Sequence, residues 1–353
     1  MSTIQTLSEE IGRGLSELCP SLSKPLRRKL PLAIAAMLEV QSPNTVELSN
    51  ALPLNLDRQD MREQWLRRLL ASPALNCEVV MEPLARDVLR QATAHGETLL
   101  LSLDQTDLGN RMAILMLAVR IGERALPLLW TAEAGAANLG FEKQKLLLER
   151  ILTWIPEGTR VLLLADRFYP SSDLFHWLQE HHWSYRLRLK GNLLADPGFG
   201  DEKLTGELLE PGMTECYLPN VRLFGKTPVM TAIGILQEAG HAEPWIIAMD
   251  ASPTKATVLD YASRWAIEPM FSDFKSRGFE LEDSQLKQPD RLERMVLIMA
   301  IAMHWCVHIG QDQAIAQPTP LEKKHKNKVS RPIGALKNSI GAESHGSLAD
   351  CVI

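Results

Sequence analysis

The 353-residue chain lacks the sequence features of several common protein classes. Its five cysteines are scattered with no Cys-x2-Cys spacing, which argues against a zinc cluster or a disulfide framework and favours a reducing compartment. The N-terminal segment has no apolar signal core. The longest apolar run, from Met295 to Val307, contains His304 and is too short to span a bilayer. The sequence therefore predicts a soluble, cytoplasmic protein with no membrane partner, in which this run is a buried helix.

Nucleotide-binding and zinc-protease motifs are also missing. There is no glycine-rich Walker loop and no Gly-x-Gly-x-x-Gly, so no nucleotide cofactor is expected. His304 and His308 share a helix face, but without a His-Glu-x-x-His pattern a metal role is not expected. The net charge of −5 is not that of a typical nucleic-acid binder, so any DNA surface must be a local basic patch.

Shifts in pattern divide the chain into five segments. In order, they are a helical module (1–95), the first half of an α/β domain (96–190), a β-rich insertion (191–244), the second half of that domain (245–310) and a basic polar tail (311–353). Basic clusters occur in the first and the last segment. Each cluster fits either phosphate binding or an ordinary solvated surface.

Two aspartates follow apolar runs that are typical of buried strands. Asp104 ends the run TLLLSLD, and Asp166 ends RVLLLAD. From Glu97 the chain reads as a three-strand meander followed by alternating helices and strands, which predicts a mixed sheet with helices on its faces. Ligands bind at the carboxyl ends of strands in open sheets, so the two carboxylates are expected side by side if their strands pair. Taken alone, each aspartate fits a turn cap better, because an aspartate at a strand end commonly has that role.

A third carboxylate lies in the segment from Asp260 to Glu280, which reads as one helix. At 100° per residue, four polar side chains of this segment fall on a stripe about 60° wide. They are Tyr261, Arg264, Glu268 and Lys275. Apolar residues fill the opposite side, so the helix is expected to bury that side and to present a mixed-charge face. Because Pro269 removes a backbone hydrogen bond, a kink is expected between Trp265 and Pro269.

Three convergent carboxylates would repel one another unless a divalent cation lay between them. Hard oxygen ligands favour Mg²⁺ or Mn²⁺. Two such ions can activate a water molecule and stabilise a leaving oxygen, which is the chemistry of phosphodiester cleavage and transesterification. The alternative for Glu268 is a surface ion pair with Arg264 or Lys275.

The polar stripe has the form Tyr-x2-Arg-x3-Glu-x6-Lys, and in this the chain resembles the DDE transposases of the insertion sequence 4 type. The resemblance extends to SLDQTDL around Asp104, ADRFY around Asp166 and the segment YRLRLKGN, and it covers residues 97 to 310. It implies a ribonuclease H-like fold with a β-rich insertion between the second aspartate and the glutamate. One departure is Phe168, where the family often has glycine two residues after the second aspartate.

The resemblance also implies roles for residues and partners. Asp104, Asp166 and Glu268 would be catalytic and would ligate two Mg²⁺ or Mn²⁺ ions. The residues expected to contact DNA phosphates are Tyr261, Arg264, Lys275, Arg188 and Lys190. Arg188 and Lys190 share one face of their strand with Arg186, which suggests a DNA-facing edge. The partners would be double-stranded DNA, as terminal inverted repeats and as target, and a second copy of the chain, in a bacterial cytoplasm at the nucleoid.

Two other functions fit the same residues. One is a ribonuclease H-like nuclease that cuts DNA but does not join it. The other is a catalytically silent, DNA-binding remnant of a transposase.

Overall fold

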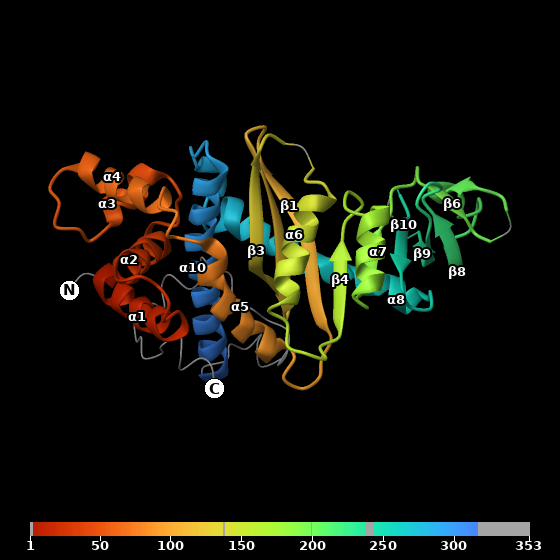
Figure 1. Ribbon diagram of the computed structural model, residues 1–353, viewed down its shortest axis with the longest axis horizontal. Coiled ribbons are helices and arrows are strands. Elements are labelled where there is room, and N and C mark those ends of the chain that lie inside the picture. Colours follow the sequence, from red (N-terminus) through yellow and green to blue (C-terminus); the bar gives the residue numbers. More distant parts are fainter. Residues whose placement is uncertain (1–2, 137, 199, 238–242, 317–353) are drawn as a thin grey trace.

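The computed structural model describes residues 3–136, 138–198, 200–237 and 243–316. Five helices form its N-terminal region (Figure 1). They are α1 (Thr3–Leu18), α2 (Lys24–Val40), α3 (Thr45–Ala51), α4 (Gln59–Leu70) and α5 (Cys77–Ala92). The side chains of Asn44 and Asn76 accept the backbone N–H groups of Val46 and Val79, so both α3 and α5 begin at an asparagine cap.

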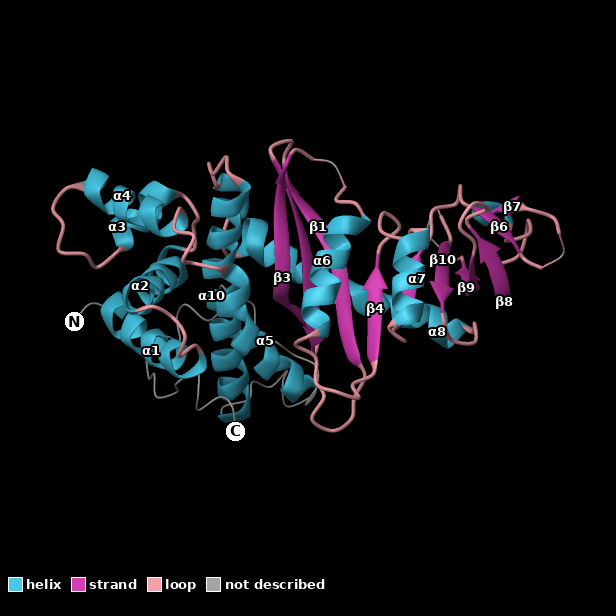
Figure 2. Ribbon diagram, in the orientation of Figure 1, coloured by secondary structure: helices cyan, strands magenta, loops and turns pink. Residues whose placement is uncertain are grey.

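A ten-stranded sheet runs through the rest of the molecule, in the order β3-β2-β1-β4-β5-β10-β9-β8-β6-β7 (Figure 2). Its first five strands along the chain are β1 (Leu99–Leu108), β2 (Met112–Ile121), β3 (Arg124–Ala134), β4 (Val161–Ala165) and β5 (Ser184–Arg188). The others are β6 (Leu194–Asp196), β7 (Lys203–Leu204), β8 (Glu215–Leu223), β9 (Val229–Leu236) and β10 (Trp245–Met249).

The first three strands form the predicted antiparallel meander. Its two tight turns contain Gly109 and Gly122, whose positive φ angles of 55° and 60° suit glycine. Strand β4 lies parallel to β1 and β5 lies parallel to β4, whereas β10 is antiparallel to β5. The sheet is therefore mixed, and parallel pairing brings the carboxyl ends of β1, β4 and β5 toward the same side.

Helices cover both faces of the sheet. Helices α6 (Phe141–Leu152) and α7 (Ser172–Glu180) contact each other and pack on β3 and β5, in front of the sheet in Figure 1. Residues 255–277 lie behind it and contact β1, β4 and β5. This architecture confirms the predicted α/β fold, a mixed sheet flanked by helices with an N-terminal helical module and a β-rich insertion.

The β-rich insertion is continuous with the main sheet. Strand β9 pairs with β10, and β8 and β6 extend the sheet outward from it. Hydrogen bonds thus link the insertion strands to β5 through β10. The segment limits predicted from the sequence stay predictions, because sheet pairing alone does not divide a chain into domains.

Helix α10 (Pro289–Ala316) contains the long apolar run and is buried as predicted. Every residue from Met295 to Val307 is buried, and the helix packs on β3 and on α2, α4 and α5. By length and hydropathy Pro289–Ile309 would suffice to cross a membrane, but 78% of its apolar window is buried inside the protein, as in a core helix. Residues 311–316 of the predicted tail are helical, and residues 317–353 lie outside the described part of the chain.

Candidate active site

The two aspartates lie side by side where β1 and β4 pair. Leu103 of β1 is the register partner of Ala165, the last residue of β4, so the next residues on each chain are Asp104 and Asp166. The expectation that Asp104 ends its strand is wrong, because β1 continues to Leu108 in antiparallel pairing with β2. Asp104 instead marks the point at which β1 extends beyond β4, so it has no strand-pairing partner on that side.

In the turn after Asp166, two adjacent aromatic side chains, Phe168 and Tyr169, point in opposite directions. The backbone N–H of Tyr169 donates to the carbonyl of Asp166 at 3.1 Å, which closes the turn. The buried Tyr169 ring points inward, and its hydroxyl donates to Asp104 Oδ1 at 3.2 Å. Phe168 points outward and is 48% exposed. The role of Tyr169 was missed in the sequence, although Asp166 is a residue type that commonly opens such a turn.

The segment from Asp260 to Glu280 is not one straight helix, so that prediction is wrong. After α8 (Lys255–Leu259) come a 3₁₀ helix at Asp260–Ala266, α9 at Ile267–Ser272 and a π turn at Asp273–Arg277. The change from 3₁₀ to α geometry falls within the region where a kink is expected. Pro269 lies in the first turn of α9, directly after the 3₁₀ helix, where its fixed φ angle suits helical backbone.

The 3₁₀ geometry aims two side chains of the stripe at the strand ends. With three residues per turn, Tyr261 and Arg264 point in the same direction. The Tyr261 hydroxyl donates to Asp166 Oδ1 at 3.3 Å. Both side chains are buried, with Tyr261 1% and Arg264 7% exposed. The polar stripe therefore packs against the sheet at this end instead of facing solvent, contrary to the expectation from helical periodicity.

Arg264 joins two of the three carboxylates. Its Nη1 donates to Asp104 Oδ2 and its Nη2 donates to Glu268 Oε1, both at 2.8 Å. Asp104 and Glu268 thus contact the same guanidinium, while Asp166 contacts the neighbouring Tyr261. The structure brings five of the predicted site residues together in one cluster, at the end of β4.

Burial controls the electrostatics of this cluster. Desolvation raises the pKa of Asp104, the charge of Arg264 opposes that rise, and the nearby Asp166 adds to it. Burial also raises the pKa values of Tyr169 and Tyr261, so both phenols stay protonated and act as hydrogen-bond donors. Burial alone would lower the pKa of Arg264, but Tyr261 and the carboxylates of Asp104, Asp166 and Glu268 together outweigh it and raise that pKa. The guanidinium is therefore the permanent positive charge of the cluster.

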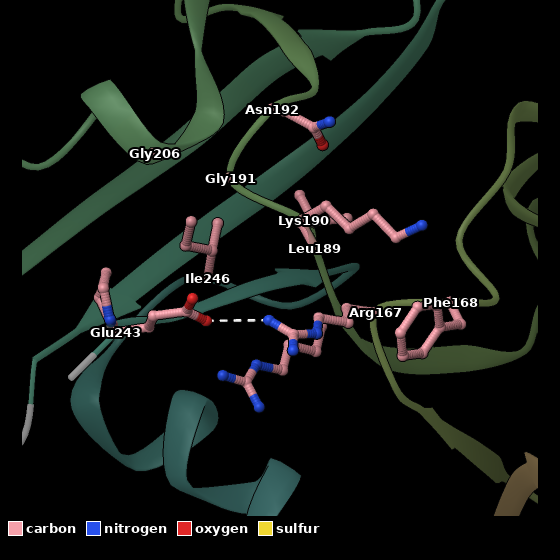
Figure 3. A pocket seen from close by; sticks show the side chains of 11 residues that line it. Arg167, Phe168, Leu189, Lys190, Gly191, Asn192, Gly206, Glu243 and Ile246 are labelled. Carbon is pink, nitrogen blue, oxygen red and sulfur yellow. Dashed lines mark hydrogen bonds and ion pairs between the residues drawn. The ribbon is translucent and has the colours of Figure 1, made fainter. Parts of the chain in front are cut away.

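The other three predicted site residues lie outside the cluster. Lys275 is in the π turn, where its Nζ is 3.6 Å from Glu282 Oε1. Arg188 and Lys190 line a cavity together with Arg167 and Phe168 (Figure 3). The prediction that Arg188 and Lys190 lie on an edge strand is wrong, because β5 pairs with both β4 and β10. Arg186, on the same face, is buried and paired with Asp250 and Asp260.

The cluster has the donor chemistry that a hard divalent cation takes. Three carboxylates come from β1, from the turn after β4 and from α9, and carboxylate oxygens are preferred ligands of Mg²⁺ and Mn²⁺. As the side chains stand, no group of three His, Cys, Asp or Glu residues within the described ranges is arranged to hold a metal. The positive charge between Asp104 and Glu268 is that of Arg264. The three carboxylates are thus the type of ligand that such an ion takes, while the Arg264 guanidinium lies between two of them.

Comparison with known proteins relates the chain to one family. Residues 141–305 match the family model of the transposase DDE domain, a range that includes Asp166, Glu268 and the polar stripe but not Asp104. This match supports a DDE transposase. No curated protein matches the chain. Among solved structures, Argonaute of Marinitoga piezophila in complex with 5′ OH guide RNA and target DNA is similar at 10% identity, with a TM-score of 0.26. The similarity covers 82% of this chain and 40% of that one.

Proposed function

We propose that this chain, which carries a match to the transposase DDE domain, is a DNA transposase of the insertion sequence 4 type. It would bind the terminal inverted repeats of a transposon, cleave a DNA strand at the transposon end and join that end to target DNA. The observation that carries the proposal is the convergence of Asp104 and Glu268 on Arg264, beside Asp166, within one buried cluster.

In this proposal Asp104, Asp166 and Glu268 would hold Mg²⁺ or Mn²⁺, with two ions bound. Such ions lower the pKa of a bound water molecule and stabilise the leaving oxygen of a phosphodiester. Tyr169 and Tyr261 orient the two aspartates through their hydroxyl groups. The cation requirement follows from the chemistry of the three carboxylates.

The basic residues would bind the DNA backbone. Arg264 presents two Nη groups that now contact two carboxylates, and the same planar fork fits two oxygens of one phosphate. Lys275, Arg188 and Lys190 lie farther out, where they would contact phosphates along the strand. These local cations would provide DNA affinity despite the net charge of −5. We further propose that the protein works in the cytoplasm and that two copies hold the two transposon ends.

A cleavage assay tests the proposal. The substrate is a labelled duplex carrying the terminal repeats that border the coding sequence, incubated with Mg²⁺ or Mn²⁺. Wild type is expected to nick the duplex, whereas Asp104→Ala and Glu268→Ala should bind it without cutting. Asp107→Asn is the matched control, because Asp107 lies on the same strand, is exposed and contacts only Gln105 among the contacts described. Cleavage by Asp104→Ala at the wild-type rate would refute the assignment of the carboxylates.

A joining assay with pre-cut transposon ends distinguishes transposition from the two alternative functions. Wild type should join a pre-cut end with a free 3′-hydroxyl to a target duplex. Cleavage without joining would indicate a nuclease. Binding without either reaction would indicate a silent remnant.

A further inference from the structure

A buried arginine lies where β5 and β10 meet the segment that carries the polar stripe. This residue, Arg186 of β5, is buried although it carries a charge. The resemblance gives roles to Arg188 and Lys190 after it, but none to Arg186. Because a guanidinium is costly to remove from water, a buried one needs several well-placed partners, and those partners indicate what it holds in place.

Two contacts of Arg186 reach the start of the 3₁₀ helix. Its Nε donates to the carbonyl of Thr257 at 3.0 Å, and its Nη2 donates to Asp260 Oδ2 at 3.2 Å. Thr257 lies in the last turn of α8, where carbonyl groups lack a helical donor, so Arg186 supplies one. Asp260 is the first residue of the 3₁₀ helix. The guanidinium therefore holds the point at which the backbone changes from α to 3₁₀ geometry.

The other contacts tie the same guanidinium to the sheet. Its Nη1 donates to the carbonyl of Tyr185 at 2.8 Å and to Asp250 Oδ1 at 3.2 Å. Asp250, which directly follows β10, also accepts the Tyr185 N–H at 3.1 Å and the Ser184 hydroxyl at 2.8 Å. One planar group thus joins β5, the end of β10 and the segment behind the sheet.

The start of the 3₁₀ helix decides where two side chains of the cluster point. Tyr261, which follows Asp260, donates to Asp166, and Arg264 lies one 3₁₀ turn later. Each residue turns by about 120° in a 3₁₀ helix and by about 100° in an α-helix. A start displaced by one residue would therefore rotate Tyr261 and Arg264 by about 20°, which is the limit of about 10–20° that a catalytic arrangement tolerates.

We propose that Arg186 is a positioning residue for DNA cleavage. By holding Thr257 and Asp260, it fixes where the 3₁₀ helix begins. The start of this helix in turn aims Tyr261 and Arg264 at the three carboxylates of the cluster. Those carboxylates are not among the contacts of Arg186 in the described part of the chain, so it acts through other residues. The inference rests on the proposed function, because it names a residue that orients the same cluster.

The test compares Arg186→Met with the control Arg222→Met. Both arginines lie on strands and pair with two carboxylates, but the partners of Arg222 are Asp196 and Glu202. Arg186→Met should lower the cleavage rate at saturating terminal-repeat duplex roughly hundredfold, because a misplacement of ~1 Å has an effect of that size. The Kd of the duplex, measured by anisotropy without divalent cations, should stay close to that of wild type. Arg222→Met should change neither quantity.

A spectroscopic measurement reports on the 3₁₀ helix without DNA. Trp265 packs edge-on against Trp245, with ring centroids 5.3 Å apart, so this pair should contribute to the near-ultraviolet circular dichroism spectrum. Its contribution is the difference between each protein and the same protein with Trp265→Phe. Arg186→Met should alter this difference under conditions where it still unfolds in one cooperative urea transition, and Arg222→Met should not. A role in stability alone would lower the urea midpoint and leave the difference unchanged.

A second variant tests whether Arg186 acts through Asp260. The Asp260 side chain is 47% exposed, and Asp260→Ala leaves Arg186 paired with Asp250, so this variant should fold. It should reproduce part of the loss of rate, and the double variant should be no slower than Arg186→Met. Additive losses would overturn the inference, because they would show that the two residues act independently.

The outcomes also separate this inference from the proposed function. An unchanged rate and an unchanged tryptophan signal in Arg186→Met would overturn the positioning role and leave cleavage by the carboxylates standing. A wild type that cuts no DNA would refute the proposed function. In that case, a tryptophan signal altered in Arg186→Met but not in Arg222→Met would still support the placement of the 3₁₀ helix by Arg186.

Discussion

Replacing Arg264 by methionine tests the central contact of the cluster. The substitution keeps a long apolar stem but leaves Asp104 without its buried counter-charge. The side chains of Arg264 and Asp104 are only 8% and 18% exposed, and removing one partner of a buried ion pair costs about 3–5 kcal/mol. Asp104 keeps hydrogen bonds from the Gln105 N–H and the Tyr169 hydroxyl, so the lower end, about 3 kcal/mol, is expected.

Thermal unfolding measures this loss. At about 2 °C per kcal/mol for a large domain, the Tm of Arg264→Met should fall by about 6 °C. Glu268→Gln is the control variant, because it removes only the ion pair between Arg264 and Glu268, whose side chain is 57% exposed. It should lower the free energy of unfolding by under about 1 kcal/mol. The double variant with Asp104→Asn should recover most of the loss, since no buried charge then lacks a partner. Equal Tm values for Arg264→Met and Glu268→Gln would show that the buried bridge does not exist.

Three further predictions concern metal, pH and packing. Millimolar Mg²⁺ should raise the Tm of Arg264→Met more than that of wild type in a thermal-shift titration, because the guanidinium no longer competes for the oxygens of Asp104 and Glu268. Burial lowers the pKa of His304 from 6.5 to about 4. The neutral, buried imidazole therefore contributes fully to the free energy of unfolding above pH 6.5, and this contribution is lost as pH falls through 4. Between pH 7 and 4, the free energy of unfolding of wild type should fall by up to about 3 kcal/mol more than that of His304→Gln, as measured by urea titration. Gly234→Ala should cost about 1–3 kcal/mol in the same assay, because its Cβ would overlap Val258 Cγ2, whereas the exposed Met230→Ala on the same strand should be neutral.

Much of the fold could be predicted because its signals are local. Largely apolar runs mark β1 and β4, and an aspartate directly follows each run in the sequence. Parallel pairing in the observed register, which ends at Leu103 and Ala165, then places the next residues, Asp104 and Asp166, close together. The apolar run from Met295 to Val307 likewise predicts a buried helix without knowledge of its neighbours.

The arrangement around Arg264 could not be predicted from local pattern. An offset of three residues between Tyr261 and Arg264 fits a 3₁₀ helix and an α-helix equally well, so periodicity does not reveal the helix type. The burial of Arg264 depends on Asp104, which is 160 positions away in the sequence. The same holds for β5, whose central place depends on pairing with β10 after the whole insertion.

The position of α10 sets the order in which the chain can complete its folding during synthesis. Helices α2, α4 and α5 are made early, but α10, which packs on all three, begins only at Pro289. At about 5–20 residues per second, roughly 10–50 s separate the synthesis of α2 from that of α10. During this interval the N-terminal helices must expose apolar surface, which makes the nascent chain a substrate for chaperones. A chain truncated before residue 289 should therefore aggregate, even though it keeps every residue of the first five helices.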